Sequence, residues 1–237
     1  REAGKMLEEV HNKLAGFVKP GISTLEIDQF GEKAIRDLGC VPNFLNYNGY
    51  PASICVSVND EVVHGIPSKD RILQDGDIVS LDAGLIHEGY HSDAARTHAV
   101  GNISEEAKRL IEVTKQSFFE GIKLAVPGNH LFDISEAIQK YVESNGYSVV
   151  RDLVGHGIGT HLHEDPQIPN FKQRRKGMKL RPGMTLAIEP MVNEGSYDVV
   201  WLDDDWTVVT EDGSLAAHYE NTIVITEDGC EILTLSE

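Results

Sequence analysis

A repeat at a separation of 107 residues is the feature that most constrains the fold of this chain. The matches are Pro20-Gly21 with Pro127-Gly128, Ile27 with Ile134, Gly39 with Gly146, and residues 73–76 with residues 180–183. At the same separation, Asp82 falls on Glu189. Coincidence among common residues is one explanation of these matches. The other is one pseudo-symmetric α+β domain over residues 1–237, whose halves (about 1–100 and 101–237) each place a carboxylate at the end of a matching strand.

The hydrophobic pattern predicts the same order of elements in both halves. A helix is predicted over residues 2–18, stopped by Pro20-Gly21, and Ser23, Thr24 and Glu26 predict the cap of a second helix that runs to Gly39. Strand-like runs follow at 53–58, 78–82 and 94–100. Two more helices are predicted at about 104–125 and 131–145, and then strands at 185–191, 207–210, 219–226 and 231–235.

Composition narrows the class of protein and its partners. A formal net charge of −17 disfavours nucleic acid and anionic membranes, because phosphate binding needs clustered Lys and Arg, and it favours cations such as metals and amino termini. There is no run of about 18 apolar residues and no secretory signal pattern. Three widely spaced cysteines do not suggest disulfides. We expect a soluble, cytoplasmic protein, with a few residues upstream of Arg1, where the helical pattern is already running.

One segment, residues 171–181, is strongly basic. Such runs are most often solvated loops, and a contact with RNA or with an acidic partner is the alternative. A transient contact with the ribosome through Lys172, Arg174, Arg175 and Lys176 would be one form of that alternative.

Two aspartates stand at the edges of strand-like runs. Asp82 follows the apolar stretch 78–81, where a charge is costly unless it is paired or bound to a metal. Asp93 comes eleven residues later, which leaves room for a turn at Glu88-Gly89 and a returning strand. Two carboxylates brought together repel each other, and a bridging cation removes that repulsion.

Three further residues share this character. His156 lies among glycines in Gly155-His156-Gly157, where the backbone can fold closely around one imidazole, although such a histidine is often a turn residue. Glu189 ends the apolar run 185–188, and Glu220 opens the run 222–226. Each acid alone could be an edge charge. His161 and His163 could form a metal pair, but His161 is interpreted as structural or exposed.

A single site made from four carboxylates and one imidazole explains why all five residues stand beside apolar strands or among glycines. Oxygen-rich ligation suits Mn(II), Fe(II) or Co(II) better than a tetrahedral structural zinc. Carboxylates can bridge two ions held roughly 3.5–4 Å apart, which lowers the pKa of a shared water so that hydroxide can attack a carbonyl at neutral pH. The residues alone therefore predict a metal-dependent hydrolase.

With these residues in place, the chain resembles the type I methionine aminopeptidases of peptidase family M24. The likeness spans essentially the whole chain and includes Val63-His64-Gly65-Ile66-Pro67 and His163-Glu164-Asp165-Pro166. Only 25 residues lie between His163 and Glu189, so the helical insertion of type II enzymes is absent. The resemblance implies the pita-bread fold: a pseudo-twofold central antiparallel sheet covered by two pairs of helices.

The resemblance also implies roles for the site. Two divalent ions (Co, Mn, Fe(II) or Zn) would be held by Asp82, Asp93, His156, Glu189 and Glu220, with Asp93 and Glu220 bridging. Glu189 would also shuttle a proton, His163 would donate to the oxyanion, and His64 would contact the scissile amide nitrogen. The substrate would be a nascent polypeptide with a free N-terminal Met and a small second residue, and the enzyme a monomer.

The family's methionine pocket maps onto six residues: Phe44, Tyr47, Tyr50, Cys55, Leu162 and Trp206. Aromatic rings and a sulfur suit a thioether, although ordinary core residues would look the same. Phe44 replaces a frequent Cys and Leu162 a frequent Phe, which leaves the pocket apolar but changes its shape.

Two other hypotheses for the function of the chain compete with this one. The first is a prolidase or aminopeptidase P of the same fold, and the second is a metal-free binding module.

Overall fold

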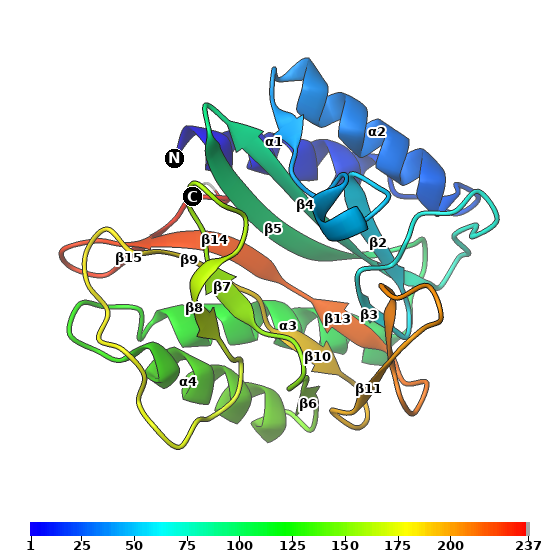
Figure 1. Ribbon diagram of the computed structural model, residues 1–237. Helices are drawn as coiled ribbons and strands as arrows, with labels where there is room; N and C mark the ends of the chain where they lie inside the picture. Colours follow the sequence, from blue (N-terminus) through cyan, green and yellow to red (C-terminus); the bar gives the residue numbers. More distant parts are fainter. Residues whose placement is uncertain (236–237) are drawn as a thin grey trace.

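The computed structural model describes residues 1–235, and within them two pairs of helices enclose a curved sheet (Figure 1). The helices are α1 (Glu2–Phe17), α2 (Thr24–Asp37), α3 (Glu105–Ile122) and α4 (Leu131–Ser144). The strands of the main sheet are β1 (Val41–Pro42), β2 (Ile54–Val58), β4 (Ile78–His87), β5 (Tyr90–Ala99), β7 (Gly155–Gly157), β8 (Glu164–Ile168), β9 (Thr185–Ile188), β14 (Glu220–Ile225) and β15 (Cys230–Ile232).

Two small sheets and a short helix complete these elements. One sheet contains β6 (Ser148–Val149), β10 (Met191–Asn193) and β13 (Ala216–His218), and the other contains β3 (Glu61–Val63), β11 (Val199–Trp201) and β12 (Val208–Thr210). The 3-10 helix η1 (Tyr47–Gly49) follows β1. The central order β4-β5-β14-β9-β7 is antiparallel throughout, so strands from both halves of the chain share one sheet.

Each pair of helices packs on its own half of the sheet. The apolar faces of α1 and α2 bury Leu7, Leu14 and Ile27 against β2, β4 and β5. In the other half, α3 and α4 bury Phe118 and Ile138 against β9 and β14. Figure 1 shows the first pair above the sheet and the second pair below it. At roughly 25 cal/mol per Å² of apolar surface, these two cores are the main source of stability.

The backbone repeats the 107-residue separation seen in the sequence. The amide of Gly21 donates to the carbonyl of Leu73 at 2.8 Å, and the amide of Gly128 donates to that of Leu180 at 3.1 Å. Gly21 and Gly128 both have φ of +90°, a conformation that a side chain would strain. The helices that follow begin at positions 107 residues apart, Thr24 and Leu131. The matched turns therefore have the same geometry.

The helix predictions are confirmed to within a few residues, including the cap of α2. Ser23 Oγ accepts from the Glu26 amide at 3.2 Å, while the Ser23 amide donates to the Glu26 carboxylate at 2.8 Å. The predicted turn at Glu88-Gly89 joins β4 to β5, and both residues have positive φ.

Several strand boundaries were wrong. Asp82 does not end its strand, because β4 continues to His87 along the full length of β5. The predicted strand 185–191 breaks into β9 and β10 at Glu189-Pro190, since proline has no amide hydrogen for the ladder. The run 219–226 likewise begins only at Glu220, and 231–235 shrinks to β15.

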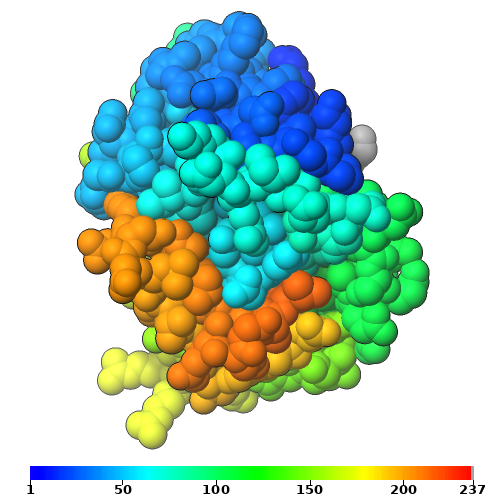
Figure 2. Space-filling model, turned by 90° about the vertical axis from the view of Figure 1, so that its right-hand side faces the viewer, coloured from blue at the N-terminus to red at the C-terminus, as the bar shows by residue number. Residues whose placement is uncertain are grey.

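The helices, the cysteines and the basic segment bear on the predictions from composition. No helix within residues 1–235 is long and apolar enough to cross a membrane. All three cysteines are free thiols. The basic segment forms an exposed loop, and Figure 2 shows side chains of this yellow part of the chain projecting from the surface. Its Lys172 pairs with Glu136 on α4 at 2.5 Å.

Candidate metal centre

The register of the central strands brings the predicted acids onto one face. Asp82 on β4 pairs with Ala95 on β5, which in turn pairs with Glu220 on β14. Asn221 pairs with Ile188 on β9, and continuing that register by one residue sets Glu220 opposite Glu189. Because side chains alternate between faces, these acids point the same way.

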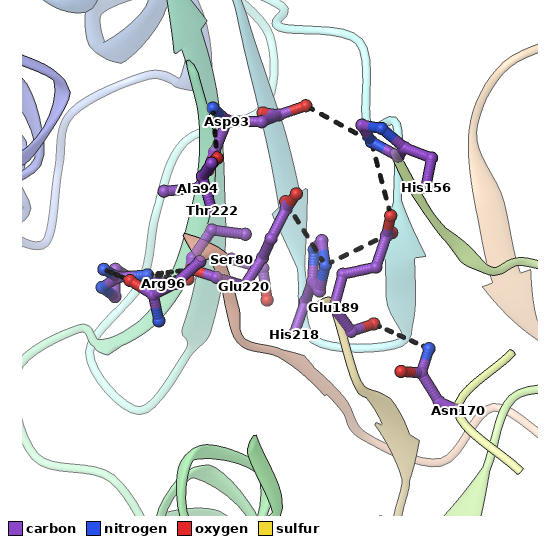
Figure 3. A network of polar contacts seen from close by, with 12 residues as sticks. Ser80, Asp93, Ala94, Arg96, His156, Asn170, Glu189, His218, Glu220 and Thr222 are labelled. Atoms are coloured by element: carbon purple, nitrogen blue, oxygen red, sulfur yellow. Dashed lines mark hydrogen bonds and ion pairs between the residues drawn. The ribbon is translucent and has the colours of Figure 1, made fainter. Parts of the chain in front are cut away.

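Asp93 and His156 join this face by the same alternation. Asp93 pairs with Gly84, two residues beyond Asp82, and His156 pairs with Ala187, two residues before Glu189. Nε2 of His156 lies 3.7 Å from both Asp93 Oδ2 and Glu189 Oε1 (Figure 3). Ligand atoms of Asp93, His156 and Glu220 all lie within 4.8 Å of one another. The structure thus brings all five predicted residues to one pocket.

The acids lie together at high electrostatic cost, with Asp93 and Glu220 buried and Asp82 and Glu189 half-buried. Burial raises the pKa of Asp82 to about 7. The pKa values of Asp93 and Glu220 rise well above the usual range, through burial and then through repulsion by neighbouring carboxylates. Burial and the charge of Asp82 do the same to the pKa of Glu189. Without compensation, such a group of carboxylates would be protonated rather than charged.

A divalent cation would supply that compensation. Asp82 Oδ1, Asp93 Oδ1 and Glu220 Oε1 are buried and have no hydrogen-bond partner among residues 1–235. Such atoms are expected to bind water or an ion. Oxygen ligands with one imidazole nitrogen form the donor set preferred by Mn(II), Fe(II) or Co(II). The residues present therefore fit a divalent metal ion.

Close backbone packing orients His156. A Cβ atom added to Gly155 would lie 2.4 Å from the Ala187 carbonyl, and one added to Gly157 would lie 2.3 Å from the Asp165 carbonyl. Both glycines are therefore required for this approach of the strands. Nδ1 of His156 lies 2.9 Å from the Gly157 carbonyl, to which it donates when protonated, leaving the Nε2 lone pair directed at the acids. Burial lowers the pKa of His156 to about 4, so the ring is neutral near pH 7.

The pocket that holds the acids has a volume of about 430 Å³, and its other wall is largely apolar. Phe44, Tyr50, Cys55 and Leu162 are buried in one cluster, against which Tyr47 and Trp206 pack. The rings of Tyr50 and Trp206 meet edge to face, with centroids 5.1 Å apart. All six residues expected for a methionine pocket line this cavity, together with Asn48 and Gln167, which the sequence did not indicate.

Two further histidines lie at the junction of the acids and the apolar pocket. His163 Nδ1 lies 2.8 Å from Tyr47 Oη, and its ring centroid is 4.2 Å from that of His156. His64 has a φ of +59°, and burial lowers its pKa to about 4. His161, by contrast, is exposed and lies beside Glu164.

Sequence reasoning missed two residues that contact the acids or their strands, the half-buried Arg96 and the buried His218. The guanidinium of Arg96 donates to the Glu220 carbonyl and, at 2.5 Å, to Asn221 Oδ1 (Figure 3). His218 ends β13, and its Nε2 lies near both Glu189 and Glu220. Neither lies in a recognisable motif, and only its distance of two residues from Glu220 could have drawn attention to His218.

Comparison with known proteins gives a consistent result. The family model described as metallopeptidase family M24 matches residues 1–227. A protein named methionine aminopeptidase from Clostridium acetobutylicum is 58% identical over 237 residues, which is 100% of this chain and 95% of that relative.

Solved structures extend the likeness to the fold. The methionine aminopeptidase of Thermotoga maritima superposes with a TM-score of 0.97 at 47% identity, covering 99% of this chain and 94% of that one. An Xaa-Pro dipeptidase from Bacillus anthracis has a TM-score of 0.80 at 25% identity, covering 100% of this chain and 59% of that one. The expectation of a pita-bread fold is thereby confirmed.

Proposed function

The chain belongs to metallopeptidase family M24, and from this premise we propose that it is an aminopeptidase that removes N-terminal methionine from peptides and proteins. The second residue of the substrate is small. The observation that carries the proposal is the position of the buried acids and His156 directly beside a pocket of aromatic rings, Leu162 and a thiol. A methionine side chain is unbranched and polarizable, and it suits such a lining.

Asp82, Asp93, His156, Glu189 and Glu220 would hold two divalent ions, and Co(II), Mn(II), Fe(II) or Zn(II) are the candidates. Bound ions of this kind lower the pKa of a water and polarise a carbonyl. Support for this ligand set comes from the unpartnered carboxylate oxygens and from the neutral His156, whose Nε2 faces the acids.

The protein's own groups would then handle protons and orientation. Glu189 would accept a proton from the attacking water and return it to the leaving amine. His163, aligned through its Nδ1 contact with Tyr47, would donate from Nε2 to the developing oxyanion. His64 would contact the scissile amide nitrogen. The free α-amine of the substrate would lie at the acids, so a blocked terminus should not be cleaved.

The wider assignment has three further parts. We propose a single catalytic domain, built from halves of about 1–100 and 101–237 and acting as a monomer in the cytoplasm. Its substrates would be nascent chains. The basic loop would contact the ribosome transiently through Lys172, Arg174, Arg175 and Lys176. If reversing these charges leaves co-sedimentation with ribosomes unchanged, the loop is only a solvated surface.

A product assay tests the proposed function. The metal-stripped protein is supplied with Mn(II), Co(II), Fe(II) or Zn(II) and given Met-Ala-Ser, acetyl-Met-Ala-Ser and an X-Pro dipeptide. Release of Met from the first peptide alone is the expected result. Cleavage of the X-Pro substrate instead would assign the chain the activity named for the dipeptidase relative. Failure to bind any of these ions by calorimetry would leave a metal-free binding module.

A further inference from the structure

His218 is a buried imidazole beside the proposed metal ligands that the proposed mechanism does not use. The residue is 2% exposed and lies at the end of β13, two positions before Glu220. Its backbone is fixed by Thr97, whose hydroxyl both donates to the His218 carbonyl and accepts from the His218 amide, each at 2.9 Å. Ser80 Oγ lies 2.8 Å from the same hydroxyl, so the contact that fixes the His218 backbone involves β4 as well as β5.

The side chain points at two carboxylates at once. Nε2 of His218 lies 3.9 Å from Glu189 Oε2 and 4.0 Å from Glu220 Oε2, and Figure 3 shows the ring between the two acids. That nitrogen is buried and has no hydrogen-bond partner among residues 1–235. A buried ring nitrogen left without a partner is costly, so a position this close to two acceptors calls for one.

We propose that His218 is a positioning residue, whose Nε2–H donates to the carboxylates of Glu189 and Glu220 and holds them in the arrangement that accepts divalent cations. The inference rests on the proposed function. A movement of about 1 Å by either carboxylate brings its oxygen within hydrogen-bond distance. Groups that hold metal-binding side chains from behind commonly change metal affinity by about 10- to 100-fold when removed.

The chain offers a matched control in His98 on β5. Its Nε2 is also buried and lacks a partner within residues 1–235. His98 lines a smaller cavity with Ile111, Lys115 and His218 itself. Its side chain nevertheless leaves the opposite face of β5 from Asp93, Ala95 and Thr97, because side chains alternate along a strand. Replacing His98 therefore changes a half-buried imidazole of the same sheet without touching the proposed hydrogen bond.

Calorimetric titration of Mn(II) into the metal-stripped protein tests the proposal, with His218→Leu, His218→Gln and His98→Gln compared with the wild type. His218→Leu should bind Mn(II) about 10- to 100-fold more weakly. His218→Gln, which keeps an N–H donor of similar reach, should recover most of the affinity, and His98→Gln should bind like the wild type. Wild-type affinity in His218→Leu would overturn the proposal, as would equally weak binding in His218→Gln.

Nitrogen-detected NMR of the imidazoles in the wild-type protein, loaded with diamagnetic Zn(II), covers the case in which His218→Leu does not fold. A proton on Nε2 of His218, in slow exchange with water, is expected, with the signal assigned by its loss in His218→Gln. A ring protonated only on Nδ1 would overturn the proposal. If the wild type neither binds Mn(II) nor releases Met, the proposed function itself has failed. If it does both while His218→Leu is unaffected, only this inference has.

Discussion

Replacing Arg96 should destabilise the protein more than replacing any exposed arginine. Its guanidinium lies among four acceptors at the junction of β5 and β14: the carbonyls of Ala95 at 2.7 Å, Thr234 at 3.2 Å and Glu220, and the amide oxygen of Asn221 at 2.5 Å. It also covers the ring of Tyr219, 4.6 Å from the centroid. These contacts fix the start of the strand that carries Glu220.

The size of the effect follows from these contacts. Hydrogen bonds from a charged donor contribute roughly 1.5–3 kcal/mol each, and Arg96→Met would remove all four, although Asn221 Oδ1 keeps its hydrogen bond from Thr234 Oγ1 at 2.9 Å. Removing a largely buried cation recovers part of its desolvation cost. We therefore expect a net loss of roughly 2–4 kcal/mol in the free energy of unfolding, because the surviving aliphatic chain still packs. At this chain length, that corresponds to a fall in Tm of roughly 4–16 °C.

Urea unfolding of the metal-stripped protein, followed by circular dichroism, measures this loss. Arg109→Met is the matched control, because Arg109 makes one exposed hydrogen bond of 3.3 Å and should lose less than about 0.5 kcal/mol. The loss of stability in Arg96→Lys should lie between those of the other two variants, because an ammonium group keeps the charge but not the planar set of N–H donors. If Arg96→Met loses less than about 1 kcal/mol, the junction does not depend on this network and the reasoning is refuted.

Three other substitutions should change stability, metal binding or catalysis. Burial, with nearby Arg96, holds the pKa of His11 well below its usual range. The contribution of His11 to stability is therefore present above about pH 6.5 and lost as the pH falls. His11→Gln should make the free energy of unfolding fall less steeply below that pH, by up to about 1.4 kcal/mol per pH unit, and an unchanged slope would contradict this. Gly155→Ala should lower the free energy of unfolding by roughly 1–3 kcal/mol and weaken Mn(II) binding, because the new Cβ would lie 2.4 Å from the Ala187 carbonyl. Gly16→Ala is the control and should be tolerated, because a Cβ at that position would have no atom within 4 Å. His163→Ala should lower kcat on Met-Ala-Ser by about 100- to 1,000-fold, and a change in KM alone would assign His163 to binding instead.

Much of the architecture was predictable because it depends on long periodic patterns and on local turn chemistry. The helices have apolar stripes, and the capping box of Ser23 and Glu26 marks the start of α2. The matched Pro-Gly turns mark the two halves. The four acids and the imidazole were also identifiable, because charges beside apolar strand runs and a histidine among glycines are unusual in any core.

The remaining elements depend on contacts that periodicity does not record. Strands such as β7 and β10 have three residues, too few to establish a period. β4 continues past Asp82 because its ladder with β5 runs unbroken to the hairpin, although Ala83-Gly84 offers little hydrophobic signal. Arg96 and His218 acquire their surroundings only when β5, β13 and β14 come together.

Anomalous diffraction from crystals of the protein soaked in Mn(II) would show directly whether the five side chains bind metal. Anomalous density for two ions is expected inside the ring formed by Asp82, Asp93, His156, Glu189 and Glu220. Loss of that density in Asp93→Asn should accompany loss of Met release. Density only at surface carboxylates, or none in a protein that still releases Met, would contradict the claim that these five side chains hold the reactive metal.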